Sequence, residues 1–156
     1  MISKLQNITW SQLVGKLDRL PHALLLHGAP GVGKLALAEQ FAQFLLCEKR
    51  GQGAVPCGTC EGCRWFLAGN HPDARIVEPA AVALALARPR SATEEGEEES
   101  SSEKKKPSIE IRIDEVRALA GFVNVKSHRG SLRVAIIHPA EDITIQAANA
   151  LLKTLE

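Results

Sequence analysis

The first part of the chain alternates between helical and extended hydrophobic patterns. Apolar residues recur with a helical period up to Pro21, so a helix is expected over residues 10–20. The next apolar run lacks polar alternation and predicts a strand over residues 23–27, buried on both faces of a mostly parallel sheet. After a glycine-rich turn, a second helical stripe predicts a helix from about residue 33 to residue 47.

The same two spacings continue through the rest of the chain. Isoleucines at every second position predict a half-buried strand over residues 109–113, and Asp114 is well placed to cap a helix over residues 115–125. Shorter patterns predict helices over residues 61–68 and 147–156 and strands over residues 74–79 and 132–137. Strands and helices in this alternation favour an α/β fold in which helices flank a parallel sheet.

An internal segment and the C-terminal end of the chain are less regular. Residues 80–107 pass from an Ala/Leu-rich piece to an acidic run, a serine run and three lysines. Because that segment offers little apolar surface to offset the entropy of ordering, most of it is expected to be a solvated, disordered insertion. The final helix ends without a glycine, proline or capping residue, so residues 1–156 are expected to be the N-terminal part of a truncated domain.

Composition narrows the class of protein. A net charge of +1 favours neither a strongly basic nucleic-acid surface nor an acidic mimic, so any DNA contact would be local. No apolar run reaches the ~18 residues that a membrane span requires, and no signal peptide is apparent, so a cytoplasmic location is expected. All four cysteines lie between residues 47 and 63 in a chain without an export signal, which favours metal binding over disulfides.

A glycine-rich loop between the predicted strand and helix has the pattern of a phosphate-binding loop. The pattern is Gly28-x-x-x-x-Gly33-Lys34, with a further glycine at Gly31. Glycines let backbone N–H groups point at a phosphate, and the N-terminus of the next helix adds positive potential. These four residues are therefore a candidate residual phosphate or nucleotide site, with Lys34 as the charge for the phosphates.

The residues that would hold Mg²⁺ beside this loop are missing. Leu35 stands where the pattern has Ser or Thr, and the strand over residues 132–137 leads into His138-Pro139 rather than a carboxylate. Loss of two parts of one magnesium site favours a domain that no longer hydrolyses ATP. The alternative is an active ATPase in which Glu141 or Asp142 replaces the missing carboxylate.

The cysteines have the spacing of a metal site inserted over residues 47–63. Overlapping C-x-x-C turns present thiolates to one ion, and four thiolates complete a closed tetrahedral zinc site with a structural role. Iron–sulfur ligation is the alternative. His71 follows closely in sequence but is more typical of a turn than of an additional ligand. The predicted zinc ligands are Cys47, Cys57, Cys60 and Cys63.

Four stretches together resemble bacterial DNA polymerase III clamp-loader subunits, which are members of the AAA+ class. These stretches are PHALLLHG at residues 21–28, the cysteine module, HPD at residues 71–73 and NALLKTLE at residues 149–156. The resemblance covers nearly the whole chain apart from about residues 80–107. It implies a P-loop, RecA-like fold with an inserted zinc-binding module.

The resemblance also implies a function. Motor subunits of that family keep a hydroxyl residue after the loop lysine and an Asp-Glu pair at the third strand, where this chain has Leu35 and His138-Pro139. In these departures the chain resembles the ATPase-inactive subunit of the family. The resemblance implies that it is a component of a DNA-directed DNA polymerase holoenzyme and that it helps to load the sliding clamp on primed DNA during replication. The alternatives are an ATP-hydrolysing motor subunit of the gamma/tau type and a metal-binding regulatory module unrelated to replication.

The implied cofactors and partners follow from that role. The resemblance implies structural zinc, and ATP binding that is weak or absent. It implies contacts with the motor and delta subunits, and with the sliding clamp and primed DNA through the assembled complex. No membrane partner is expected.

Overall fold

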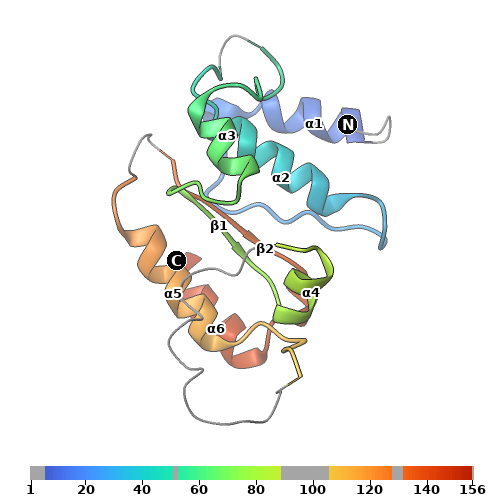
Figure 1. Ribbon diagram of the computed structural model, residues 1–156, viewed down its shortest axis with the longest axis vertical. Helices are drawn as coiled ribbons and strands as arrows, with labels where there is room; N and C mark the ends of the chain where they lie inside the picture. Colours follow the sequence, from blue (N-terminus) through green and yellow to red (C-terminus); the bar gives the residue numbers. More distant parts are fainter. Residues whose placement is uncertain (1–5, 51–52, 89–105, 128–131, 156) are drawn as a thin grey trace. The chain divides into compact units, whose positions relative to one another are not determined.

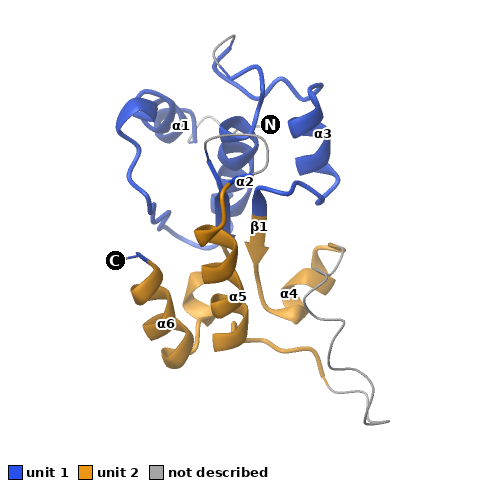
Figure 2. Ribbon diagram, turned by 90° about the vertical axis from the view of Figure 1, so that its left-hand side faces the viewer, with its two compact units in different colours: residues 1–74, 127–136, 155 blue, residues 75–126, 137–154, 156 orange. Residues whose placement is uncertain are grey.

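The computed structural model describes residues 6–50, 53–88, 106–127 and 132–155. The chain divides into two compact units, and Figure 2 colours them separately: residues 1–74, 127–136 and 155 in one, residues 75–126, 137–154 and 156 in the other. Each unit has its own hydrophobic cluster. Within the described ranges, no helix has the length and apolarity needed to cross a membrane.

The described part of the first unit contains helices α1 (Gln6–Val14), α2 (Lys34–Leu45) and α3 (Glu61–Leu67) (Figure 1). Its core forms where Trp10 of α1 packs edge-on against two aromatic rings of α2. The Trp10 ring centroid lies 6.1 Å from that of Phe41 and 5.6 Å from that of Phe44. Partly buried leucines, including Leu13 and Leu26, complete this apolar cluster. The helices predicted over residues 33–47 and 61–68 are thus confirmed.

The N-terminal helix is displaced from its predicted position. A helix was expected over residues 10–20, whereas α1 ends at Val14 and a single 3₁₀ turn, η1 (Leu17–Arg19), follows. Gly15 lies between them, and the next backbone bond, from Lys16 N to Leu13 O, is already of the tighter i to i−3 type. Glycine disfavours the helix interior, which explains the early end of α1.

The strand predicted over residues 23–27 is wrong. The segment is extended, but within the described part of the chain no backbone hydrogen bond pairs it with a neighbouring strand. Leu25 is 78% exposed and Leu24 is 46% exposed, so the segment is not buried on both faces. An apolar run shows only that a segment can be buried, and burial of a strand requires neighbours on both sides.

The described part of the second unit contains α4 (Ala80–Ala85), α5 (Ile113–Asn124), the 3₁₀ turn η2 (Ala140–Asp142) and α6 (Ile145–Leu155). Its fully buried centre is formed by Ile111, Val116 and Ala147. Apolar residues from the ends of both strands, from the position after η2 and from α6 pack around this centre, among them Val77, Ile137, Ile143 and Leu151. The helix predicted near the end of the chain is confirmed by α6.

Strands β1 (Ala74–Val77) and β2 (Val134–Ile137) form a two-stranded sheet. At one end Val134 N donates to Asp73 O, and at the other His138 N donates to Val77 O. The two bonds keep the same residue offset along both strands, as only parallel strands do. The strands predicted over residues 74–79 and 132–137 are therefore confirmed, and the chain is a mixed α/β protein with a small parallel sheet.

The strand predicted over residues 109–113 is wrong. Ile111 forms only an isolated parallel bridge with Ile143, through Ile111 N to Asp142 O and Thr144 N to Ile111 O. The backbone then turns into α5 at Ile113. The alternation correctly marked Ile111 as a core residue, but a period of two over five residues does not exclude a helix that begins within them.

Asp114 is not the cap of the following helix, contrary to prediction. Because α5 begins earlier than expected, Asp114 lies in its first turn, exposed, with a carboxylate oxygen 3.6 Å from Arg117 Nη1. Glu115 performs the capping instead: its Oε2 accepts from the backbone N–H of Arg112 at 2.6 Å. This is the carboxylate half of a capping box.

The start of the predicted insertion is ordered. Residues 80–85 form α4, and Arg88 after it pairs with Glu78, with 3.4 Å between Arg88 Nε and Glu78 Oε1. Alanine and leucine are the strongest helix formers, which explains why this piece is helical. Residues 89–105 of the predicted insertion lie outside the described residues.

Candidate metal centre and phosphate-type loop

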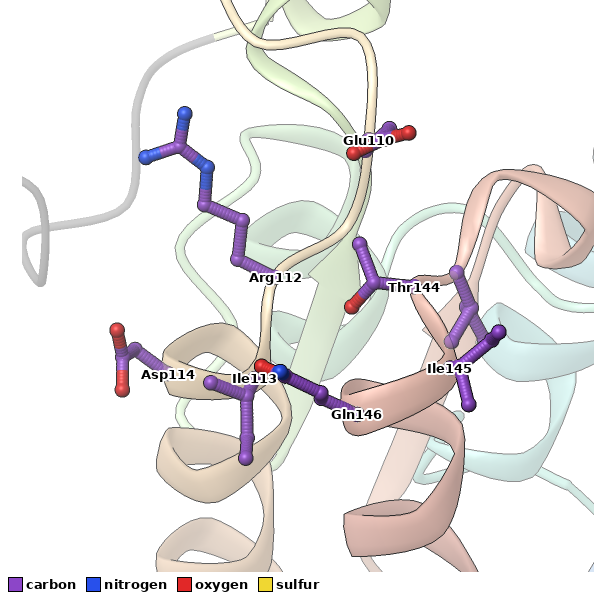
Figure 3. A pocket seen from close by; sticks show the side chains of 8 residues that line it. Glu110, Arg112, Ile113, Asp114, Thr144, Ile145 and Gln146 are labelled. Atoms are coloured by element: carbon purple, nitrogen blue, oxygen red, sulfur yellow. The ribbon is translucent and has the colours of Figure 1, made fainter.

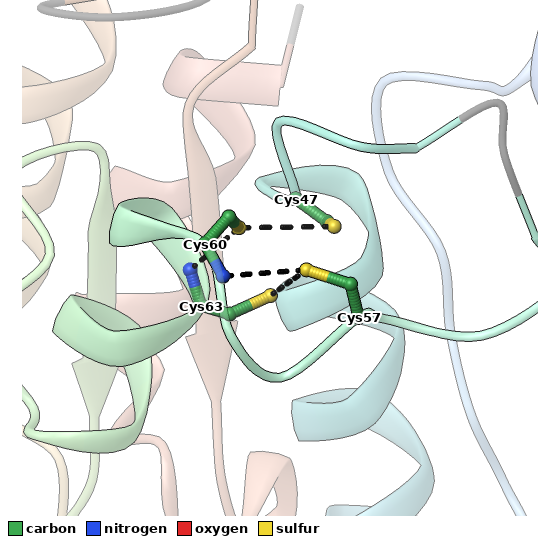
Figure 4. A group of neighbouring side chains, drawn as sticks. All are labelled: Cys47, Cys57, Cys60 and Cys63. Atoms are coloured by element: carbon green, nitrogen blue, oxygen red, sulfur yellow. Dashed lines mark hydrogen bonds between the residues drawn. The ribbon is translucent and has the colours of Figure 1, made fainter.

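The four cysteines predicted as metal ligands converge on one point. All four Sγ atoms lie within 4.8 Å of one another (Figure 4). Cys47 Sγ is 3.9 Å from Cys60 Sγ, and Cys57 Sγ is 3.9 Å from Cys63 Sγ. A disulfide would bring two sulfurs to about 2.05 Å, so all four side chains are free cysteines.

Helices α2 and α3 position three of these cysteines. Cys47 follows the last turn of α2, Cys60 is the N-cap of α3, and Cys63 lies in the first turn of α3. Backbone N–H groups point at the sulfurs: Cys60 N donates to Cys57 Sγ and Cys63 N donates to Cys60 Sγ, each at 3.4 Å. For Cys57, this hydrogen bond favours the thiolate form, which is the form that binds a metal.

Two glycines allow the close approach of these elements. Gly58 adopts a left-handed conformation, φ 70°, in the turn between Cys57 and Cys60. Gly62 is buried in α3, where an added Cβ would lie 2.6 Å from the carbonyl oxygen of Leu46 at the end of α2. The close packing of α3 on the end of α2 therefore depends on a missing side chain.

The thiol pKa values in the cluster are shifted in opposite directions. Hydrogen bonds from the backbone of Thr59 and Cys60 lower the pKa of Cys57 to about 6. Burial, followed by the hydrogen bond with Cys60, raises the pKa of Cys63 to about 12. A thiolate beside a buried thiol that resists ionisation is the arrangement that a divalent cation stabilises, because the cation offsets the cost of burying negative charge.

The geometry fits tetrahedral metal coordination. Four sulfurs ~2.3 Å from a central ion lie about 3.8 Å apart, close to the two separations of 3.9 Å. Four protein ligands leave no open position for a substrate or water, so the arrangement is that of a structural site. The clustered cysteines can therefore bind a metal such as zinc.

His71 supports the module from outside the four-sulfur group. Its side chain is buried, its Nδ1 accepts from the backbone N–H of Asp73 at 3.0 Å, and its ring packs edge-on against Trp65. The interpretation of His71 as a turn residue fits these contacts.

The glycine-rich loop has the backbone that its sequence predicts. Gly28, Gly31 and Gly33 have positive φ angles of 148°, 79° and 84°, and α2 begins directly afterwards at Lys34. Only glycine adopts such angles without strain, so these positions are required by the shape of the loop. The segment before the loop, however, is not the predicted strand.

Two side chains donate hydrogen bonds to the backbone carbonyl groups of this loop. Lys34 Nζ donates to Gly28 O at 2.8 Å and to Ala29 O at 3.1 Å. Gln6 Nε2, from the start of α1, donates to Val32 O at 3.0 Å and to Gly33 O at 2.8 Å. Sequence reasoning missed Gln6, because no spacing rule connects a glutamine to a loop more than twenty residues away.

Leu35 and the end of β2 are the two positions where magnesium ligands would be expected beside such a loop. Leu35 is half-buried in the first turn of α2. β2 ends at Ile137, and the carboxylates of Glu141 and Asp142 occur only in η2, after His138-Pro139.

An open pocket of about 660 Å³ lies in the second unit, between the N-terminal ends of α5 and α6 (Figure 3). Its lining includes the exposed carboxylates of Glu110 and Asp114 together with Arg112, so charges of both signs face it. The remaining lining residues are Ile113, Ile143, Thr144, Ile145 and Gln146. No sequence pattern pointed to this pocket.

Comparison with known proteins gives a consistent result. A family model described as DNA polymerase III, delta subunit matches residues 5–156. The DNA polymerase III subunit delta' of Pseudomonas aeruginosa is 42% identical over 151 residues, covering 97% of this chain and 38% of that protein. The delta' subunit of Bacillus subtilis is 32% identical, covering 89% of this chain and 33% of that protein.

A motor-type relative is also similar. The DNA polymerase III subunit tau/gamma of Haemophilus influenzae is 30% identical over 141 residues, covering 90% of this chain and 16% of that protein. The chain spans about a third of the length of the delta' relatives described here. The resemblance found from the sequence motifs is confirmed, and the chain belongs to the DNA polymerase III delta subunit family.

Proposed function

We propose that the chain is the N-terminal part of a delta'-type subunit of the bacterial clamp loader, with a structural and interaction role rather than an ATPase activity of its own. The higher identity to the Pseudomonas delta' subunit, 42% against 30% for the tau/gamma relative, supports this choice. In this role the protein contacts motor and delta subunits, and meets the sliding clamp and primed DNA through the assembled complex, in the bacterial cytoplasm.

The observation that carries this proposal is Leu35. Magnesium at a phosphate loop is held by a hydroxyl in the first turn of the following helix, and a leucine has no oxygen to offer. The ammonium of Lys34, which would meet the phosphates, is directed at the loop's own carbonyls. In the proposed AAA+, P-loop architecture, the loop then serves mainly as a turn between two elements, with weak phosphate binding at most.

The second part of the proposal is a structural zinc ion held by the four cysteines. Zinc would neutralise the buried sulfurs and tie the end of α2 to the start of α3. Those two helices carry Cys47 and the Cys60/Cys63 pair. Zinc is favoured over an iron–sulfur cluster because all four sulfurs lie within 4.8 Å of one another, and two of their separations, 3.9 Å each, are close to the edges of a tetrahedron around a single ion.

The ATPase question is tested on the purified protein, alone and reconstituted with its motor subunits. We expect no Mg²⁺-dependent ATP turnover by the protein alone. Complexes that contain the Lys34→Ala variant are expected to hydrolyse ATP at the same rate as complexes that contain the wild-type protein. Lys49→Ala, which changes an exposed lysine in the cysteine segment, is the matched control. Turnover by the isolated protein that Lys34→Ala abolishes would overturn the proposal.

The alternative function is an ATP-hydrolysing motor subunit. Gly28, Gly31, Gly33 and Lys34 favour it, because the loop keeps its backbone and its lysine. Calorimetry separates the two functions: tight Mg-ATP binding supports the motor subunit, whereas no binding, or binding that Mg²⁺ does not strengthen, supports the delta'-type role. Leu35→Ser would then be expected to strengthen binding in the presence of Mg²⁺.

A further inference from the structure

Helix α1 contacts both the glycine-rich loop and the cysteine segment, through two side chains one helical turn apart. Gln6 donates its amide hydrogens to Val32 O and Gly33 O in the loop. Trp10, four residues later and therefore on the same face of the helix, donates Nε1–H to Ala54 O at 2.9 Å. Ala54 belongs to the segment between Cys47 and Cys57. The two candidate sites of the first unit are thus bridged by one short helix.

We propose that metal binding at the four cysteines controls how firmly the glycine-rich loop is held, that α1 transmits this effect, and that Gln6 is the positioning residue of the loop. The proposal rests on the proposed metal site. It does not depend on whether the protein hydrolyses ATP.

The segment that carries Ala54 runs between two of the clustered cysteines. Cys47 and Cys57 both belong to the four-sulfur group, so a bound metal closes the intervening segment into a short loop. Ala54 and Val55 themselves are exposed and lie outside helices and strands. Releasing the metal frees one anchor of this loop and restores conformational entropy to it. The position of the Ala54 carbonyl is therefore expected to depend on the metal.

Trp10 converts movement of that carbonyl into a change in α1. Its side chain is 6% exposed and its ring is fixed between the aromatic residues of α2. If Ala54 O moves away, a buried indole N–H loses its partner, which is unfavourable unless the helix shifts. Opening of the segment thus favours movement or fraying of α1, which is only nine residues long.

Gln6 helps to fix which way the loop amides point, together with Leu37 N, which also donates to Gly33 O at 3.0 Å. In a trans peptide the C=O and the N–H face opposite sides. With the carbonyls of Val32 and Gly33 directed at Gln6, the N–H groups of Gly33 and Lys34 are turned to the opposite side. Those N–H groups are the donors that a phosphate would use. An added Cβ at Gly33 would collide with the Gln6 amide, so the fit between the two is close.

Amide hydrogen exchange of the purified, zinc-loaded protein tests the proposal. Removing zinc with a chelator is expected to accelerate exchange in segment 53–57, in α1 and, by about two- to tenfold, at the loop amides. In Trp10→Phe, which keeps an aromatic ring but lacks the donor, the segment should still respond to zinc removal and the loop should not. Ser11→Ala, at an exposed position of the same helix, should respond as wild type does.

If the zinc-free protein unfolds, the proposal is still tested by comparing the exchange rates of the variants and of wild type, all in the zinc-loaded state. Zinc-loaded Trp10→Phe and Gln6→Ala should both exchange faster than wild type at the loop amides, with α2 unchanged. By reciprocity, Trp10→Phe should bind zinc about two- to tenfold more weakly in competition with a chelator. Two results would overturn the proposal. In the first, the loop amides of zinc-loaded Trp10→Phe exchange at the wild-type rate. In the second, the loop amides of Trp10→Phe still respond to zinc removal.

Discussion

Gly62 shows how one missing side chain determines the approach of two helices. A Cβ at this position would lie 2.6 Å from Leu46 O, which is backbone and has little freedom to move. We predict that Gly62→Ala destabilises the protein by about 1 to 3 kcal/mol, measured by urea denaturation of the zinc-loaded protein. Gly121→Ala in α5 is the matched control, since an added Cβ there meets nothing within 4 Å.

The control should change stability in the opposite direction. Alanine in an open helical position favours folding by about 0.5 to 1 kcal/mol over glycine. Equal effects of the two substitutions would contradict the close contact at Gly62.

The buried ion pair between Asp73 and Arg133 offers a second test at the scale of single residues. Arg133 Nε lies 3.5 Å from Asp73 Oδ1, and the two side chains are 9% and 1% exposed. Removing the Asp73 carboxylate takes the opposite charge away from a guanidinium that is largely shielded from water, so Asp73→Asn should cost about 3 to 5 kcal/mol of unfolding free energy.

An exposed pair provides the comparison. Asp114 and Arg117 lie on the surface of α5, 84% and 68% exposed, and Asp114→Asn should change stability by less than about 1 kcal/mol. Chemical denaturation of both variants measures the two costs. A small effect of Asp73→Asn would mean that water or another group replaces the carboxylate.

At the scale of elements, the cysteine cluster joins α2 and α3. Elemental analysis is expected to find one zinc per chain, because four sulfurs surround a single point. Chelation or Cys60→Ser should lower the thermal midpoint, since Cys60 is both a ligand and the N-cap of α3. Ser11→Ala, outside the cluster, should leave the zinc content unchanged. Iron in place of zinc, or an unchanged midpoint after chelation, would contradict the prediction.

The elements that sequence patterns predicted correctly have strong local signals. α2 combines a glycine-rich start with an apolar stripe, and α3 begins at a cysteine turn. The failures at residues 23–27 and 109–113 arise where the outcome depends on neighbours. Whether an apolar extended segment becomes a strand is decided by the hydrogen-bonding partner beside it, and no pattern within the segment encodes that partner.

At the scale of the whole molecule, the two candidate sites differ in how much the sequence reveals. Cysteine spacing predicted that all four cysteines gather at one point, because metal coordination requires particular atoms at short separations. The contact of Gln6 with the glycine-rich loop could not be predicted, because any polar side chain at the start of α1 has the same local pattern. The family was recognisable from motifs spread over the chain, and the match over residues 5–156 agrees with them.

The exposed leucines before the glycine-rich loop have a practical consequence for handling the 156-residue chain. An extended apolar segment that is exposed and that forms no strand pairing within the described residues can serve as a template for β-pairing with another chain in concentrated solution. We predict that this chain self-associates as its concentration rises and that Leu25→Lys, which places a charge at a 78% exposed site, reduces light scattering without lowering the thermal midpoint. Unchanged scattering would assign the association to another surface.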